Sequence, residues 1–145
     1  MNIKNLKPNK KSRYSQGYLD PRSCKKYIDP SRPIIYRSSY EKKFIIWCEN
    51  NPNVERWGSE VIQIPYKIKG SNHTYNPDFY VEMSNGEKWL VEIKPKHQTT
   101  KPINENSWLM NEWIKNNYKW RAAMIFCESK GIKFKILTED TIRLL

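Results

Sequence analysis

One stretch of the sequence carries residues whose types and spacing suit hydrolytic chemistry. Pro77-Asp78 is followed, thirteen residues later, by Glu92-Ile93-Lys94. Glu92 and Lys94 lie two positions apart in an otherwise apolar segment, so on a strand both side chains emerge on the same face. A carboxylate and an ammonium group in such a strand are costly to bury unless they are paired or hold a metal ion.

Asp78 lies beside Glu92 only if the turn between the two strands has the right length. A two-residue turn at 85–86 sets Asp78 opposite Ile93, which points to the other face of the sheet. A three-residue loop at 84–86 sets Asp78 opposite Glu92, and it ends in the glycine that a left-handed loop position favours. We therefore predict the three-residue loop, or a bulge with the same effect.

Two carboxylates and a lysine in one place suit metal-assisted hydrolysis of a phosphodiester. Asp78 and Glu92 supply the oxygen ligands that Mg²⁺ or Mn²⁺ prefers, and waters and phosphate oxygens complete the coordination. Lys94 orients the attacking water or stabilises the charge of the phosphorane. The alternative is a surface ion pair of Lys94 with Glu92 or Asp78, because so short a pattern also arises by chance.

Other polar residues are candidates for the same site. Glu41, in the first turn of an expected helix, either projects toward the metal or completes a capping box by accepting the Ser38 backbone N–H. Glu60 is a weaker candidate that we interpret as a rim residue. His97 is either a general base or phosphate contact, or a solvated loop residue.

The hydrophobic pattern places these residues in an α/β domain. Trp120 lies on the apolar face of a long helix, and we interpret Trp108, Trp113 and Trp120 as core or interface residues rather than base stackers. Helices are expected at 39–50, 105–129 (bent or broken near 116–117) and 138–145, strands at 57–68, 79–83, 88–94 and 132–137, and loops at 70–76 and 95–104.

The net charge of +11 in 145 residues is concentrated at the N-terminus. Residues 1–37 hold ten Lys and Arg against two Asp, whereas residues 38–145 hold sixteen against thirteen acidic residues. The chain thus divides into a basic, Pro- and Tyr-containing arm (1–37) and a folded domain (38–145). The arm contacts DNA, docks on a protein or is only a solubilising tail. The DNA contacts that we predict are Arg13, Lys25, Lys26 and Arg37 of the arm, with Lys96 and Lys101 beside the site.

Composition also excludes several classes. The longest purely apolar run, 44–48, is far too short to cross a membrane. Three cysteines without a CxxC motif argue against a disulfide framework or a Cys-based zinc site, and they favour a reducing compartment.

The Asp78…Glu92-Ile93-Lys94 pattern, preceded by a helix with Glu41, resembles the PD-(D/E)xK nuclease superfamily. Several ordered blocks resemble one family more closely, the head completion nucleases of tailed bacteriophages. These blocks include Tyr36–Lys42, Trp57–Glu60, Val91–Lys96, Lys119–Ala123 and Gly131–Asp140.

The resemblance implies a restriction-endonuclease-like αβββαβ core, in which a central mixed sheet is flanked by helices. It also implies a Mg²⁺-dependent DNA nuclease (Mn²⁺ can substitute) with Glu41, Asp78 and Glu92 as metal ligands and Lys94 as the catalytic lysine. By the same resemblance, we expect the nuclease to act on packaged DNA before heads join tails, with portal, neck or head proteins as partners. Its expected locations are the host cytoplasm during assembly and the virion. The alternatives are a structural head–neck protein with a non-catalytic nuclease fold and a junction-resolving endonuclease. Monomer and homodimer both stay open.

Overall fold

A central mixed sheet organises the protein. The computed structural model describes residues 16–104 and 107–145. The sheet has the order β3-β6-β7-β8, with antiparallel pairs up to β7 and β8 parallel to β7. Its strands are β3 (Val54–Ser59), β6 (Phe79–Met83), β7 (Lys88–Ile93) and β8 (Lys133–Leu137).

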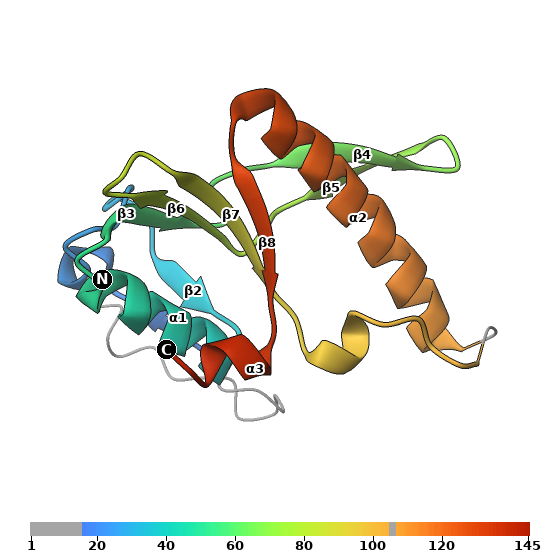
Figure 1. The fold of residues 1–145 in the computed structure, drawn as a ribbon, viewed down its shortest axis with the longest axis horizontal. Coiled ribbons are helices and arrows are strands. Elements are labelled where there is room, and N and C mark those ends of the chain that lie inside the picture. The colour runs from blue at the N-terminus through green and yellow to red at the C-terminus, as the bar shows by residue number, and fades with distance from the viewer. Residues whose placement is uncertain (1–15, 105–106) are drawn as a thin grey trace.

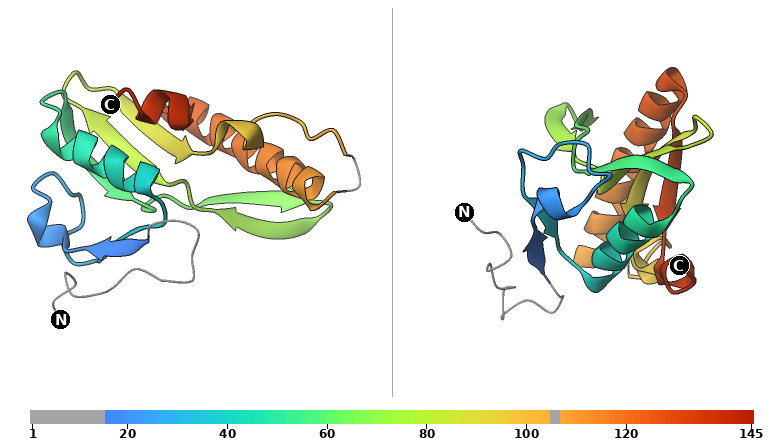
Figure 2. Two further views of the ribbon diagram at one scale, coloured as in Figure 1. Left: turned by 90° about the horizontal axis from the view of Figure 1, so that it is seen from below. Right: turned by 90° about the vertical axis from the view of Figure 1, so that its left-hand side faces the viewer.

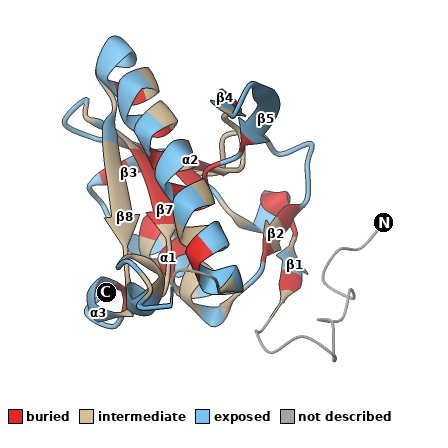
Figure 3. Cartoon of the chain, turned by 90° about the vertical axis from the view of Figure 1, so that its right-hand side faces the viewer, coloured by how far each residue is buried: buried red, intermediate tan, exposed pale blue. Residues whose placement is uncertain are grey.

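Two helices cover the sheet on opposite faces. Helix α1 (Ser39–Asn50) packs on Val91, and helix α2 (Trp108–Lys130) packs on Leu90, its neighbour along β7. Because successive strand residues point to opposite faces, the two cores lie on either side of the sheet. Figure 3 shows the buried residues gathered in the strands and along the inner sides of the helices. The chain order α1-β3-β6-β7-α2-β8 confirms the predicted αβββαβ core.

A hairpin inserted into this core was not predicted. The expected strand 57–68 is two strands, β3 and β4 (Ile64–Ile68), and the expected loop 70–76 holds strand β5 (Ser71–Tyr75). The expected strand ends after β3 because Glu60 adopts a left-handed backbone conformation (φ 52°), which turns the chain out of the sheet. The β4–β5 hairpin then runs alongside α2 (Figure 1).

Helix α2 is continuous, so the predicted break near 116–117 is wrong. Asn117 does not interrupt the helix, since its side-chain amide donates to the Trp113 carbonyl oxygen at 2.7 Å along the same helix. Gly131 ends it in the left-handed conformation (φ 69°) that a helix C-terminus favours. The last strand is followed by the short helix α3 (Glu139–Ile142), within the predicted segment.

The described part of the basic segment packs against the domain. Strands β1 (Gly17–Leu19) and β2 (Ile34–Tyr36) pair with each other beside α1, as Figure 2 shows. Ile34 is fully buried, and the Tyr27 ring meets Trp57 edge to face at 4.8 Å. The predicted DNA contact Arg13 lies outside the described residues.

Two further expectations from the sequence concern membrane spans and the cysteines. In the described ranges, no helix combines the length and apolar character that a membrane span requires. Cys24, Cys48 and Cys127 are all free thiols.

Candidate active site

The β6–β7 turn sets the register that brings the two central carboxylates together. The Met83 N–H donates to the Glu87 carbonyl oxygen at 2.8 Å across a three-residue loop, whose Gly86 has a φ of 93°. Phe79 therefore pairs with Val91, and the next position outward sets Asp78 opposite Glu92. The predicted loop length is confirmed.

Glu92 is a buried carboxylate with polar partners on several sides. Its side chain is 8% exposed; Oε2 accepts a 2.7 Å hydrogen bond from the Tyr75 hydroxyl, and Oε1 lies 3.7 Å from Lys94 Nζ. Burial raises the pKa of Glu92, while the Tyr75 hydrogen bond and the Lys94 charge act in the opposite direction. The site thus holds a carboxylate that needs positive charge nearby to stay ionised.

Asp78 shares this requirement. Its Oδ2 accepts a 2.8 Å hydrogen bond from the Ile93 backbone N–H, which fixes the side chain at the end of β7. Burial, followed by the charges of Glu92 and Glu41, raises the pKa of Asp78 well above its usual range. A divalent cation relieves this repulsion, so the donor set fits a hard metal ion such as Mg²⁺.

Glu41 combines features of both interpretations that the sequence leaves open. The Ser38 hydroxyl accepts from the Glu41 backbone N–H at 3.1 Å and donates to the Glu41 carboxylate at 3.2 Å, so Ser38 does cap α1. After burial and the charge of Glu92, the charge of Glu41 contributes to the raised pKa of Asp78. Glu41 and Lys94 line one cleft of about 250 Å³. Within the described residues, however, no three His, Cys, Asp or Glu side chains form a preassembled metal cluster.

Glu60 and Arg37 border the site through an ion pair with each other. The Glu60 backbone N–H donates to the carbonyl oxygen of Asp78 at 3.1 Å, which places Glu60 next to the residue that precedes β6. Its carboxylate is engaged by Arg37, in agreement with the expected position at the rim.

Two residues near Glu92 were missed by the sequence analysis. Tyr75 ends β5, in a segment that we expected to be a loop, so no pattern pointed to it. Lys119 comes from α2, and its Nζ lies 5.6 Å from the centre of the Tyr75 ring. Burial, followed by the charges of Lys115 and Lys94, lowers the pKa of Lys119. The hairpin and the long helix therefore both contribute to the surroundings of Glu92.

The predicted DNA contacts have different environments. Lys26 is half-buried, and its Nζ donates to the Asn51 carbonyl oxygen at 2.6 Å and to the Cys48 carbonyl oxygen at 3.4 Å, at the C-terminus of α1. Lys25 and Lys101 are exposed, whereas Lys96 is exposed but bridges to Asp140 at 3.2 Å. Their role in DNA binding stays a prediction.

Comparison with known proteins gives this geometry its context. Residues 51–139 match a family model described as TnsA-like endonuclease N terminal. The matched range includes Asp78, Glu92 and Lys94, while Glu41 precedes it. The chain is also 39% identical over 141 residues to a protein named Head completion nuclease from Enterobacteria phage T4, covering 89% of this chain and 94% of that protein. The chain therefore belongs to the TnsA-like endonuclease family, and it is also a relative of the head completion nuclease of phage T4.

Proposed function

We propose that this protein is a Mg²⁺-dependent deoxyribonuclease of phage head completion, acting on packaged DNA before heads join tails. The observation that carries the chemistry is the pairing of Asp78 with the buried Glu92, beside Lys94. The phage role is supported by the name and near-complete coverage of the T4 relative. Portal, neck or head proteins are the partners that this role requires, and the host cytoplasm is where it is exercised.

In this proposal the carboxylates bind the metal ion, and Lys94 acts on the water or the phosphate. Asp78 and Glu92, with Glu41 from α1, would hold the divalent ion, which supplies an acidified water and a counter-charge for the phosphate. Tyr75 orients Glu92 by its hydrogen bond. Lys94, at 3.7 Å from Glu92, positions the attacking water or stabilises the charge that develops on the phosphate.

A substitution at Glu92 tests this function. The purified protein is incubated with plasmid and linear DNA in Mg²⁺, beside Glu92→Gln and the matched control Glu55→Gln, an exposed glutamate on β3. We expect Glu92→Gln to cut about 1000-fold more slowly, since it loses a metal ligand. Glu55→Gln should cut like the wild type, and EDTA should stop cleavage.

Cleavage in EDTA, or equal cleavage by Glu92→Gln and the wild type, would contradict the assignment. The non-catalytic alternative is tested by complementation of a phage that lacks the protein. Infectious particles produced with Glu92→Gln at normal protein levels would favour a structural role, whereas filled heads without tails would support the nuclease.

A further inference from the structure

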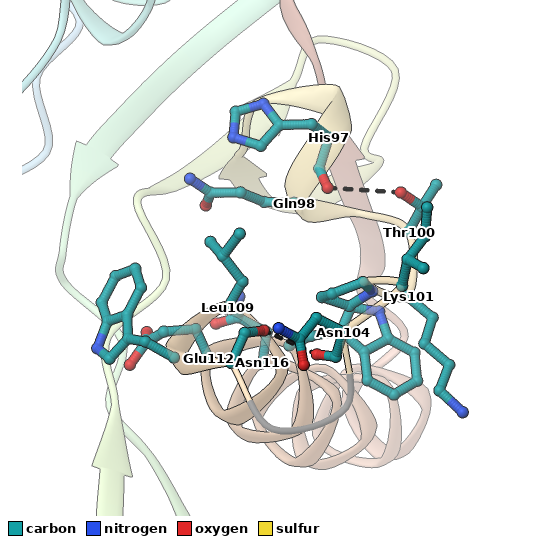
Figure 4. A pocket seen from close by; sticks show the side chains of 13 residues that line it. His97, Gln98, Thr100, Lys101, Asn104, Leu109, Glu112 and Asn116 are labelled. Carbon is teal, nitrogen blue, oxygen red and sulfur yellow. Dashed lines mark hydrogen bonds between the residues drawn. The ribbon is translucent and has the colours of Figure 1, made fainter.

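A second and larger cavity lies next to the candidate active site. It measures about 530 Å³ and is formed between the segment that follows Lys94 and the first half of α2. Figure 4 shows His97 and Gln98 on one side of this cavity, with Leu109, Glu112 and Asn116 on the α2 side. Its size falls in the range of pockets that bind small organic groups, roughly 300–1,000 Å³.

The cavity lies beside the cleft that Glu41 and Lys94 line. Gln98 lines both the 250 Å³ cleft that holds Glu41 and Lys94 and the 530 Å³ cavity. Along the chain, only Pro95 and Lys96 lie between Lys94 and His97, which lines the cavity from the short helix η3 (Lys96–Gln98). A DNA strand whose phosphate lies at Lys94 can therefore place a neighbouring nucleotide in the cavity.

The lining combines apolar, amide and cationic groups. Trp108 is 71% exposed, although an indole is usually buried, and Trp113 also lines the cavity. Asn116 is only 5% exposed and lines the same cavity, where its amide offers both a donor and an acceptor. Lys101 also lines the cavity and is exposed and positively charged.

We propose that this cavity binds an unpaired nucleotide at the end of the DNA substrate. The indoles supply stacking faces, the Asn116 amide has both donor and acceptor for a base edge, and Lys101 neutralises a phosphate. A base inside a duplex is stacked and paired, so it cannot enter a concave site without being extruded. This inference rests on the proposed action on DNA and adds a preference for ends with unpaired bases.

The proposal changes the interpretation of one tryptophan. Trp120 is buried and packs between α2 and the sheet, as expected for a core residue. Trp108 instead keeps most of its surface exposed while it lines the cavity beside the cleft of Glu41 and Lys94. A base stacker has this position, whereas a core residue does not.

Binding of oligonucleotides in EDTA tests the proposal without cleavage. The full chain is titrated into a DNA hairpin that ends in a short overhang containing 2-aminopurine, with the overhang on either strand, and into the same hairpin with a blunt end. We expect tighter binding to one overhang than to the blunt end, with quenching of 2-aminopurine on that overhang. Trp108→Ala should weaken overhang binding about tenfold and leave blunt-end binding unchanged. An abasic overhang should bind no better than the blunt end.

Tyr118→Ala provides the matched control, since Tyr118 is an exposed aromatic residue on α2 outside the cavity lining. Asn116→Ala supplies a second variant that removes the buried amide. Unchanged overhang affinity in Trp108→Ala, equal losses on blunt ends, or equal affinity for the abasic overhang would overturn the proposal. Cleavage by Glu92→Gln is measured separately, so a failed nucleotide site and a failed nuclease assignment give different results.

Discussion

The hydroxyl of Tyr75 donates a 2.7 Å hydrogen bond to the buried carboxylate of Glu92. Tyr75 is the last residue of the β4–β5 hairpin, and Glu92 lies in the central sheet, so this contact ties the inserted hairpin to the site. Because the hydrogen bond stabilises the ionised form, it opposes the effect of burial on the pKa of Glu92.

Tyr75→Phe tests the consequence of this contact. Removing the hydroxyl raises the pKa of Glu92 further, and only the carboxylate form binds a metal ion. Activity should fall about tenfold near neutrality, and the acidic limb of the pH–rate profile should move to higher pH. Tyr80→Phe is the control, because it removes a comparable 2.9 Å bond to Glu82 outside the site. An unmoved acidic limb would show that Tyr75 has only a packing role.

Lys94→Met separates chemistry from binding. Lys94 is partly exposed and lies beside Glu92, so its removal costs little packing. We expect cleavage to slow by about three orders of magnitude, with Mg²⁺ affinity and DNA affinity within a few-fold of wild type. Lys96→Met removes a charge two residues further on and should affect cleavage far less. Parallel losses in DNA affinity and rate for Lys94→Met would instead identify it as a phosphate anchor.

Asp78→Asn should stabilise the metal-free protein. A group whose pKa is raised on folding contributes stability that is fully present below its unfolded pKa and lost as pH rises through the folded pKa. Burial and the Glu92 charge raise the pKa of Asp78, so the wild type in EDTA loses stability from about pH 4 toward neutrality.

The asparagine carries no charge and retains an acceptor for the Ile93 N–H. Its free energy of unfolding at pH 7 should exceed that of the wild type by about 1 kcal/mol, and this difference should shrink near pH 4. Mg²⁺ should raise the melting temperature of the wild type more than that of Asp78→Asn. Denaturation at both pH values, with and without Mg²⁺, measures this, and a variant less stable in EDTA would refute it.

Lys25 and Lys26 should behave differently despite being neighbours. Lys26 Nζ bonds two carbonyl oxygens at the end of α1, so Lys26→Met should lower the free energy of unfolding by about 1 kcal/mol. Lys25 is exposed, and if it contacts a phosphate, Lys25→Met should reduce the salt dependence of DNA binding by a slope of about 1 without changing stability. The same stability loss in both variants would contradict this distinction.

The sequence by itself determined the central constellation, because its determinants are local. Strand alternation places Glu92 and Lys94 on one face, and the length of the loop ending in Gly86 fixes Asp78 opposite Glu92. Helix α1 follows likewise from apolar spacing and a serine cap. These features depend on neighbours within a few residues, and the structure reproduces them.

Only the tertiary structure decided what surrounds that constellation. The left-handed turn at Glu60 diverts the chain into a hairpin, and this brings Tyr75 to Glu92. Lys119 of α2 lies over the Tyr75 ring, and the Lys26 ammonium group donates to the Asn51 carbonyl oxygen at the end of α1. Each contact joins segments far apart in the chain, and its strength depends on burial and charge that no local pattern encodes. The types of the candidate catalytic residues were therefore readable from the sequence, whereas their electrostatic environment was set by the fold.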